Sequence, residues 1–450
     1  MASQPQALGR SLARGDVDYD AARRDTLWNA NLPDRFPDRI VQANSIDDVV
    51  TAVRAAKAAG QSVGVRSGGH SWSGNHVRDG GVLLDLSRLT NFTIDKASMT
   101  ATAEPGLGGS DLIAALTKQG LFFPVGHCRG VGLGGYLLQG GFGFNSRALG
   151  PACESVVAID YVDADGDLRH ASETENSEML WAARGSGPGF FGVVVRFHLR
   201  VYPAPGFIGN ALTQYSVERL DDLVRWMDHI GPDVPPQVEL QFVISRNPSF
   251  PPALRKPTGT SPVRLELVAT VMAESRSAAS TALGFLSSRP RGARRRLPLV
   301  PTPFGPMFSG VMQHYPTAKW ETDNLWTHAS ADELLPHLLR VAATVPPPPA
   351  HMLWLNWAPP ARRTDMAFSV EDRTYLSFYG GWFDDAQAAA TTEWSRGNVA
   401  AMESLSTGVQ LADDPGRPSR GVSEAAGSRL AALRAQHDPD GRFHPWIGES

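Results

Sequence analysis

Residues 64–74 read Gly-Val-Arg-Ser-Gly-Gly-His-Ser-Trp-Ser-Gly, and short apolar runs on both sides predict two strands joined by a tight turn. Gly68 and Gly69 allow a positive φ and the close approach of another group. Successive backbone N–H groups in such a turn can bind an anion. His70 follows directly, so the turn is typical of a diphosphate site with an imidazole beside it. A glycine-rich hairpin with an ordinary turn histidine is the alternative.

The composition bounds the possible functions. The chain has 450 residues, 42% hydrophobic and 20% charged, which is enough for two or three hydrophobic cores. The net charge of −4 provides no basic field for nucleic acid or an anionic membrane. The two cysteines, Cys128 and Cys153, exclude a disulfide scaffold and make a zinc site unexpected, so no metal is predicted. Residues 1–20 show no signal segment and no later run could span a bilayer, so we expect a cytoplasmic protein.

The segment from residue 39 to residue 120 alternates strand and helix patterns. A strand is expected at 39–41, followed by a helix with Ser45 as its N-cap and Gly60 just after its end. A further helix is expected over 111–119. This alternation is typical of an α/β or α+β domain.

A glycine-rich stretch follows at 121–150, where residues 130–135 fit the spacing Gly-x-Gly-x-x-Gly of the dinucleotide fingerprint. That fingerprint needs a helix that opens within the glycines. The glycines at 140, 141 and 143 would break such a helix within two turns. We therefore expect irregular backbone wrapped closely around a flat ligand.

Cys128 lies inside this stretch beside Arg129. A neighbouring cation and loop N–H groups favour the thiolate, so Cys128 is a candidate reactive residue; an inert buried thiol is the alternative. Cys153 lacks such surroundings. The sequence does not forbid a disulfide between them, although a cytoplasmic setting disfavours it.

The second half of the chain, after the prolines and glycine at 203–206, shows a different pattern. It is expected to form one antiparallel sheet backed by helices. The strands are predicted at 238–245, 263–272, 351–357 and 373–379, and the helices at 217–230, 277–286, 334–343 and 386–405.

One predicted strand in this half carries polar aromatic residues. Tyr375, Ser377 and Tyr379 alternate and so share one face, which could roof a pocket or simply cover the sheet. His314 is a loop candidate of similar weight.

Several motifs, taken together, resemble one family. They are Arg66-Ser-Gly-Gly-His70-Ser71, Phe123-Pro-x-Gly-x-Cys128-x-x-Val131-Gly-x-Gly-Gly135, and Gly140-Gly-Phe-Gly143. They resemble the FAD-linked oxidases of the vanillyl-alcohol oxidase (PCMH-type) superfamily. The nearer likeness is to the berberine-bridge-enzyme-like branch, which includes antibiotic-tailoring oxidases of secondary metabolism. The resemblance covers about 38–203 and 423–444.

The resemblance implies an α+β fold with a two-part, PCMH-type FAD-binding domain at 1–205, to which 411–450 return, and a substrate domain at 206–410. It implies a bicovalent FAD, bonded by His70 at the 8α-methyl group and by Cys128 at C6. The other implied cofactor-binding residues are Arg66, Ser67, Gly68, Gly69, Ser71, Val131, Gly132, Gly134, Gly135, Tyr136, Gly140, Gly141, Gly143, Gly192, Val193 and Val194.

The implied activity is that of an FAD-dependent oxidoreductase that takes a hydride from a C–O or C–N bond of a small molecule or natural product. A small residue at the place of Val131 resembles the arrangement that admits dioxygen, so an oxidase releasing H2O2 is favoured. The tyrosine segment that supplies the base in many relatives reads differently here, at 405–414, and contains no tyrosine. The base is therefore predicted among Tyr375, Tyr379 and His314.

Two other functions remain open. The protein could be a non-oxidative enzyme on the flavin scaffold, such as a cyclase or isomerase. It could also be a non-catalytic ligand-binding member.

Overall fold

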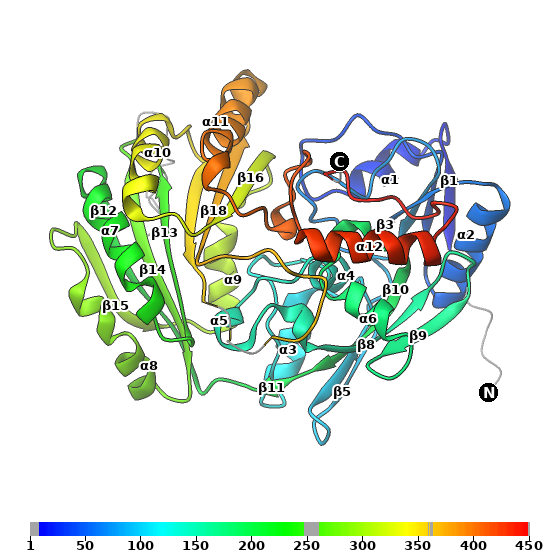
Figure 1. The fold of residues 1–450 in the computed structure, drawn as a ribbon, viewed down its shortest axis with the longest axis horizontal. Helices are drawn as coiled ribbons and strands as arrows, with labels where there is room; N and C mark the ends of the chain where they lie inside the picture. The colour runs from blue at the N-terminus through cyan, green and yellow to red at the C-terminus, as the bar shows by residue number, and fades with distance from the viewer. Residues whose placement is uncertain (1–8, 247–260, 359, 361–362, 449–450) are drawn as a thin grey trace.

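The computed structural model describes residues 9–246, 261–358, 360 and 363–448. Figure 1 shows two lobes side by side. A large sheet with helices on its outer face forms the left lobe, and the N-terminal segments and the red C-terminal helix form the right lobe.

The first sheet of the right lobe carries the 64–74 turn. Its strand order is β1-β2-β4-β3, and β4 pairs in parallel with both β2 and β3. Ser45 and Asp48 form a capping box at the start of helix α2, so the predicted N-cap at Ser45 is confirmed. The elements are β1 (Arg10–Ala13), α1 (Tyr19–Asp25), β2 (Arg39–Gln42), α2 (Ile46–Ala58), β3 (Val63–Arg66) and β4 (Val82–Asp85).

A second, five-stranded sheet has the order β5-β6-β10-β8-β9 and is antiparallel throughout. Short helices and a two-stranded ribbon, β7 with β11, accompany it. The elements are β5 (Phe92–Asp95), β6 (Thr100–Ala103), α3 (Gly109–Thr117), β7 (Leu121–Phe122), α4 (Leu133–Leu138), α5 (Ser146–Leu149), β8 (Val156–Val162), β9 (Leu168–Ser172), α6 (Ser177–Ala183), β10 (Val193–Arg200) and β11 (Tyr202–Pro203).

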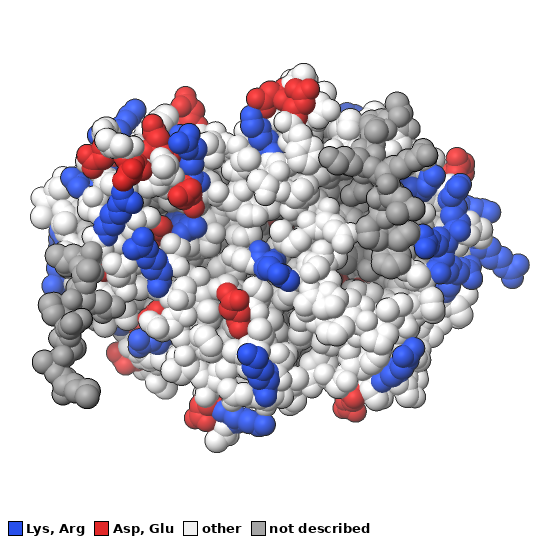
Figure 2. Space-filling view, turned by 180° about the vertical axis from the view of Figure 1, so that it is seen from behind, with Lys and Arg blue, Asp and Glu red and all other residues white. Residues whose placement is uncertain are grey.

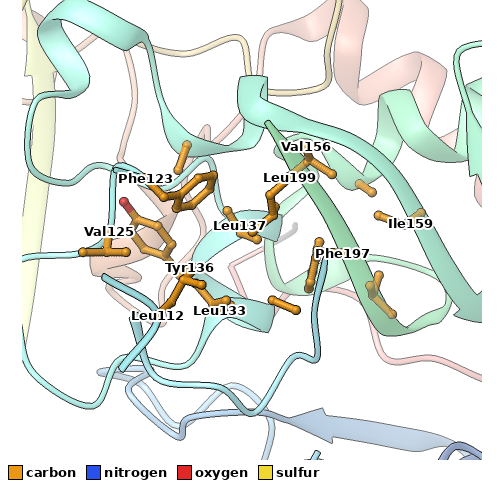
Figure 3. Close-up of a cluster of buried hydrophobic side chains, with 14 of the residues drawn as sticks. Leu112, Phe123, Val125, Leu133, Tyr136, Leu137, Val156, Ile159, Phe197 and Leu199 are labelled. Carbon is orange, nitrogen blue, oxygen red and sulfur yellow. The ribbon is translucent and has the colours of Figure 1, made fainter. Parts of the chain in front are cut away.

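Helix α4 corrects one expectation. The glycine-rich stretch is not irregular throughout, because Gly132 begins a helix of six residues that ends before Gly140. Its apolar side packs into the largest core of this lobe, where Leu133, Tyr136 and Leu137 lie near Val125 (Figure 3). The later glycines do end the helix, but six residues suffice to form it.

The C-terminal segment returns to the right lobe. Helix α12 (Glu424–His437) lies there in Figure 1, and its Leu433 is part of the core of that lobe. The N–H of Val63 on β3 donates to the carbonyl of Arg442 at 2.7 Å, and Phe443 forms a parallel bridge with Val63. The chain end therefore lies beside the strand that leads into the 64–74 turn.

The left lobe is a seven-stranded sheet of order β15-β12-β14-β13-β17-β18-β16, and all neighbouring strands in it are antiparallel. The predicted antiparallel sheet backed by helices is confirmed, with α7, α8, α10 and α11 on its outer face (Figure 1). The elements are β12 (Phe207–Ser216), α7 (Leu220–Ile230), β13 (Val238–Ser245), β14 (Arg264–Ala273), α8 (Arg276–Ala282), β15 (Arg295–Pro301), α9 (Phe304–Met312), β16 (Lys319–Thr327), α10 (Ala331–Thr344), β17 (His351–Asn356), β18 (Thr374–Trp382) and α11 (Ala388–Ala400).

Four of these elements, β12, β15, α9 and β16, were not predicted. Strand β15 begins with exposed Arg295 and Arg296 and forms one edge of the sheet. Positive side chains gather at this end of the molecule, on the right in Figure 2. Charges on an edge strand oppose pairing with another sheet edge, which is why this strand does not show an apolar pattern.

The α+β fold class is confirmed, and the domain limits at 205/206 and 410/411 stay a prediction. Among the described residues, the helices are all too short or too polar to cross a bilayer.

Candidate active site

A cavity of about 810 Å³ lies between the glycine-rich turns of the right lobe and the inner face of the seven-stranded sheet. His70 and Cys128 both line it from the right lobe, and Tyr375 and Tyr379 line it from the sheet. The structure therefore brings together residues that are about 250 to 310 positions apart in the chain.

The wall on the right-lobe side is built from backbone. A Cβ on Gly68 would lie 2.3 Å from the nitrogen of Gly132, and one on Gly132 would lie 2.6 Å from the nitrogen of Gly68. Gly69 has φ +73°, which side chains rarely tolerate. The two glycine segments thus meet backbone to backbone, and only glycine fits at either place.

Arg66 fixes the strand that enters this turn. Its guanidinium donates to Asp85 at 2.7 Å, and both side chains are largely buried. Because Asp85 ends β4, the ion pair joins the ends of β3 and β4 beneath the turn. Arg66 therefore has a structural role as well as a place on the cavity wall.

His70 stands at the edge of the turn against an indole. Its ring stacks on Trp28 with centroids 5.4 Å apart and an interplanar angle of 18°. Burial and the nearby Arg66 guanidinium lower the pKa of His70 to about 4. The imidazole is therefore neutral at pH 7 and keeps a nitrogen lone pair that can form a bond.

Cys128 does not have the surroundings that the sequence indicated. Burial and the carboxylate of Asp413 raise the pKa of its thiol to about 12. The thiolate prediction is wrong because burial and a carboxylate from the other half of the chain both oppose the charge on the thiol, while the Arg129 side chain is exposed to solvent. Both cysteines are free, so the structure holds no disulfide between Cys128 and Cys153.

Most predicted cofactor residues line the cavity. They are Arg66, Ser67, Gly68, Gly69, His70, Ser71, Cys128, Val131, Gly132, Gly134, Gly135, Tyr136, Gly192 and Val194.

Four predicted residues are absent from the cavity wall: Gly140, Gly141, Gly143 and Val193. Val193 points to the opposite side of its strand from Val194, because side chains alternate along β10. A Cβ on Gly140 would lie 2.6 Å from the Phe368 ring, and one on Gly143 would lie 2.1 Å from the Val125 carbonyl. These glycines therefore allow close packing behind the wall.

Asp413 is the centre of the sheet side of the cavity and was not predicted. Its Oδ2 accepts a hydrogen bond from Tyr379 at 2.6 Å and another from Tyr375. Ser377 Oγ lies 3.4 Å from the same oxygen, and the Trp72 indole N–H donates to Oδ1 at 2.9 Å. The strand face that was predicted to roof a pocket thus holds a carboxylate in place.

The segment that carries Asp413 is anchored on both sides. Asn324 of β16 accepts from the N–H of Gln410 at 2.7 Å and donates to the carbonyl of Asp413 at 2.9 Å. The next carboxylate, Asp414, accepts from the Trp446 indole at 2.8 Å and from Ser73, outside the cavity wall. Asp413 therefore joins the sheet to the 64–74 turn, whereas Asp414 is held by the right lobe.

The three predicted catalytic residues have different neighbours. Burial and the Asp413 carboxylate raise the pKa values of Tyr375 and Tyr379 well above the ordinary value, so both are neutral donors. Burial lowers the pKa of His314 to about 4, and its ring lies 5.7 Å from that of His351. All three line the cavity, and their catalytic role stays a prediction.

A histidine beside Cys128 links the two lobes. His127 Nε2 lies 3.0 Å from both carboxylate oxygens of Glu239 on β13, and both residues line the cavity. Burial opposes the charge on His127, but the Glu239 carboxylate outweighs it and raises the pKa of His127.

This pair predicts a pH-dependent contribution to stability. Because the folded-state pKa of His127 is raised, the contribution is complete below pH 6.5 and is lost as the pH rises through that pKa. We expect Glu239→Gln to cost about 1.5–3 kcal/mol at pH 6 and less at pH 9, measured by urea unfolding. The control is Asp372→Asn at the exposed His328 contact of 3.0 Å, which should cost well under 1 kcal/mol. The prediction would be contradicted if Glu239→Gln lowered the free energy of unfolding as little as Asp372→Asn does, and by the same amount at pH 6 and pH 9.

Comparison with known proteins identifies the class. Residues 37–172 match the family of FAD binding domains. The chain is 30% identical over 435 residues to the FAD-linked oxidoreductase nodO of Hypoxylon pulicicidum, covering 95% of this chain and 94% of that one. It is 34% identical over 236 residues to (R)-6-hydroxynicotine oxidase of Paenarthrobacter nicotinovorans, about half of each chain. The structure of Physcomitrella patens BBE-like 1 superposes with a TM-score of 0.83 at 20% identity, covering 97% of this chain and 96% of that one.

The chain therefore belongs to the FAD-linked oxidoreductases. It is an FAD-dependent enzyme, and its fold is that of the berberine-bridge-enzyme-like branch.

The residues on the right-lobe side of the cavity fit FAD. A Cβ on Gly135 would meet no atom within 4 Å, although Gly135 lies on the cavity wall, so the space beside it is free for a ligand. His70 and Cys128, the two predicted attachment residues, line the same cavity. Gly69 is left-handed, so it gives the kind of turn whose backbone N–H groups can bind an anion such as a diphosphate.

Four residues of the site were missed from the sequence: Asp413, Trp72, His127 and Glu239. Trp72 and His127 each lie within two positions of a predicted covalent residue, so that proximity was a usable signal. Asp413 lies inside the 405–414 segment that had been noted for its missing tyrosine. A carboxylate there could have been proposed as the replacement. Glu239 gave no signal beyond a charge in a predicted strand.

Proposed function

We propose that this protein is an oxidase that removes a hydride from a C–O or C–N bond of a small molecule or natural product. The observation that carries the proposal is the position of Asp413 opposite His70 and Cys128 in one cavity. We propose that His70 and Cys128 hold FAD covalently, at the 8α-methyl group and at C6. The bound flavin accepts the hydride and is reoxidised by dioxygen, which gives H2O2.

We propose Asp413 as the group that accepts the substrate proton. General bases act within hydrogen-bond reach of the proton they remove, and Asp413 reaches the cavity between the two tyrosines. Tyr375 and Tyr379 are protonated donors, so they orient Oδ2 and leave the proton acceptance to the carboxylate. This replaces the prediction that one of the tyrosines or His314 is itself the base.

The test uses the purified yellow enzyme and a panel of primary and secondary alcohols and amines. Under anaerobic conditions a substrate should bleach the flavin and be converted to the corresponding carbonyl or imine. Admission of air should then restore the colour, with one H2O2 formed for each flavin reoxidised. A substrate that is isomerised or cyclised without bleaching would overturn the proposal in favour of a non-oxidative enzyme. Flavin that no bound compound ever bleaches would overturn it in favour of a binding protein.

A further inference from the structure

The cavity continues beyond Asp413 along the inner face of the sheet. Side chains that line it form a single cross-strand row, in which each residue is the registered partner of the next. From β18 to β15 the row is Tyr375, Leu355, Gln241, Val268, Leu212 and Leu297.

The register gives the length of this row. Neighbouring strands lie about 4.8 Å apart, so the five steps from Tyr375 to Leu297 span roughly 24 Å. A channel of that length is far longer than the reacting group of a substrate needs.

The chemistry of the row is mostly apolar. Leu355, Val268, Leu212 and Leu297 are aliphatic, and Gln241 is the polar position among the inner residues. Helix α9 supplies Met307 and Val311 on the cavity wall as well.

The acidic side chains of the cavity lie on its sheet side, where one of them, Glu239, is paired with His127. The carboxylates of Glu239, Glu266 and Asp413 line the cavity. Arg66, on the FAD side, is the one lysine or arginine among the described lining residues. An anionic ligand would therefore meet repulsion on the sheet side, whereas a neutral or cationic ligand would not.

The far end of the row opens to solvent. Val300 of β15 is 43% exposed and lines the cavity, and Pro306, Ser309 and Gly310 of α9 are exposed lining residues too. The mouth thus lies between β15 and α9, and the closed end lies at Asp413.

We propose that this row is the binding channel for an elongated, largely apolar small molecule that is neutral or cationic. The molecule enters between β15 and α9 and presents its oxidised carbon at the Asp413 end. The proposal rests on the proposed function for the position of the reacting end, and it adds the substrate class.

The test measures binding rather than turnover. The probes are n-alkyl amines, n-alkyl alcohols and n-alkyl carboxylates from butyl to octadecyl, titrated into the flavin-loaded enzyme by calorimetry and by perturbation of the flavin spectrum. Burial of each added methylene should strengthen the binding of amines and alcohols by about fourfold until the channel is filled. Carboxylates of equal length should bind at least tenfold more weakly.

The variant Leu212→Trp locates the binding path. It places a large ring four strand steps from β18. The affinity for the longest probes should therefore fall at least tenfold, and the affinity for the shortest probes should stay unchanged. Leu339→Trp is the matched control, because Leu339 of α10 is 50% exposed on the outer face of the sheet. Leu339→Trp should leave the affinity for every probe unchanged.

The outcomes separate the two proposals. Affinity that does not depend on chain length, or equal weakening of short and long probes by Leu212→Trp, overturns the channel even if the enzyme is an oxidase. Tighter binding of carboxylates overturns the charge assignment. Length-dependent binding to an enzyme whose flavin no substrate bleaches supports the channel and contradicts the oxidase.

Discussion

Replacement of Asp413 by asparagine should slow the reduction of the bound flavin by about 10²- to 10⁴-fold. Asparagine keeps the size of the side chain but has one acceptor oxygen, which can serve the two tyrosines or Trp72 and not both. It cannot take up the substrate proton. The measurement is anaerobic stopped-flow reduction of the flavin, with any alcohol or amine that bleaches the wild-type enzyme. The amount of flavin bound should stay the same, because the variant leaves His70, Cys128 and the glycine turns unchanged.

The matched control is Asp414→Asn. It makes the same chemical change one position along, at a carboxylate bonded to Ser73 and Trp446 outside the cavity wall. Asp414→Asn should lower the stability and leave the reduction rate within a few fold of wild type. Equal rates for wild type and Asp413→Asn would show that another group removes the proton.

The second large effect concerns the attachment of the flavin. Acid-precipitated wild-type protein should stay yellow, and its denatured mass should exceed that of the polypeptide by one FAD. His70→Ala and Cys128→Ala should each keep one link, so both should retain the added mass. The double variant should release its flavin on denaturation and show the mass of the bare polypeptide.

Cys153→Ala provides the control for loss of a thiol. Cys153 is buried against Met366, at 3.8 Å between the sulfur atoms, and is absent from the cavity wall. Its replacement should leave the added mass and the spectrum unchanged. Flavin that stays attached in the double variant would place the links on other residues.

The parts of the fold that local chemistry determines could be predicted. Helix α2 carries its own N-cap at Ser45 and a regular apolar spacing, so its start was correct to the residue. Glycine is required at positions 68 and 69 because a side chain there would clash with neighbouring backbone atoms. The alternation of Tyr375, Ser377 and Tyr379 placed them correctly on one strand face.

The parts that long-range contacts determine could not be predicted. Strand β16 reads as polar because Asp323 and Asn324 are buried inside it, and their partners come from elsewhere. Asp323 is paired with Arg417 at 2.7 Å, and Asn324 holds the segment of Asp413. Asp413 likewise lies in a segment without any hydrophobic periodicity. Its role in the site depends on hydrogen-bond donors more than thirty positions away in the chain.

The loop at 64–74 has one more consequence. It carries the imidazole predicted to bond the flavin and, two residues later, the indole that holds the carboxylate opposite. Because three consecutive residues set both positions, a hinge between the lobes cannot separate them without breaking the Trp72 contact. Substitutions in the cross-strand row of the sheet can therefore change which molecules bind, while the positions of His70 and Asp413 relative to each other stay the same.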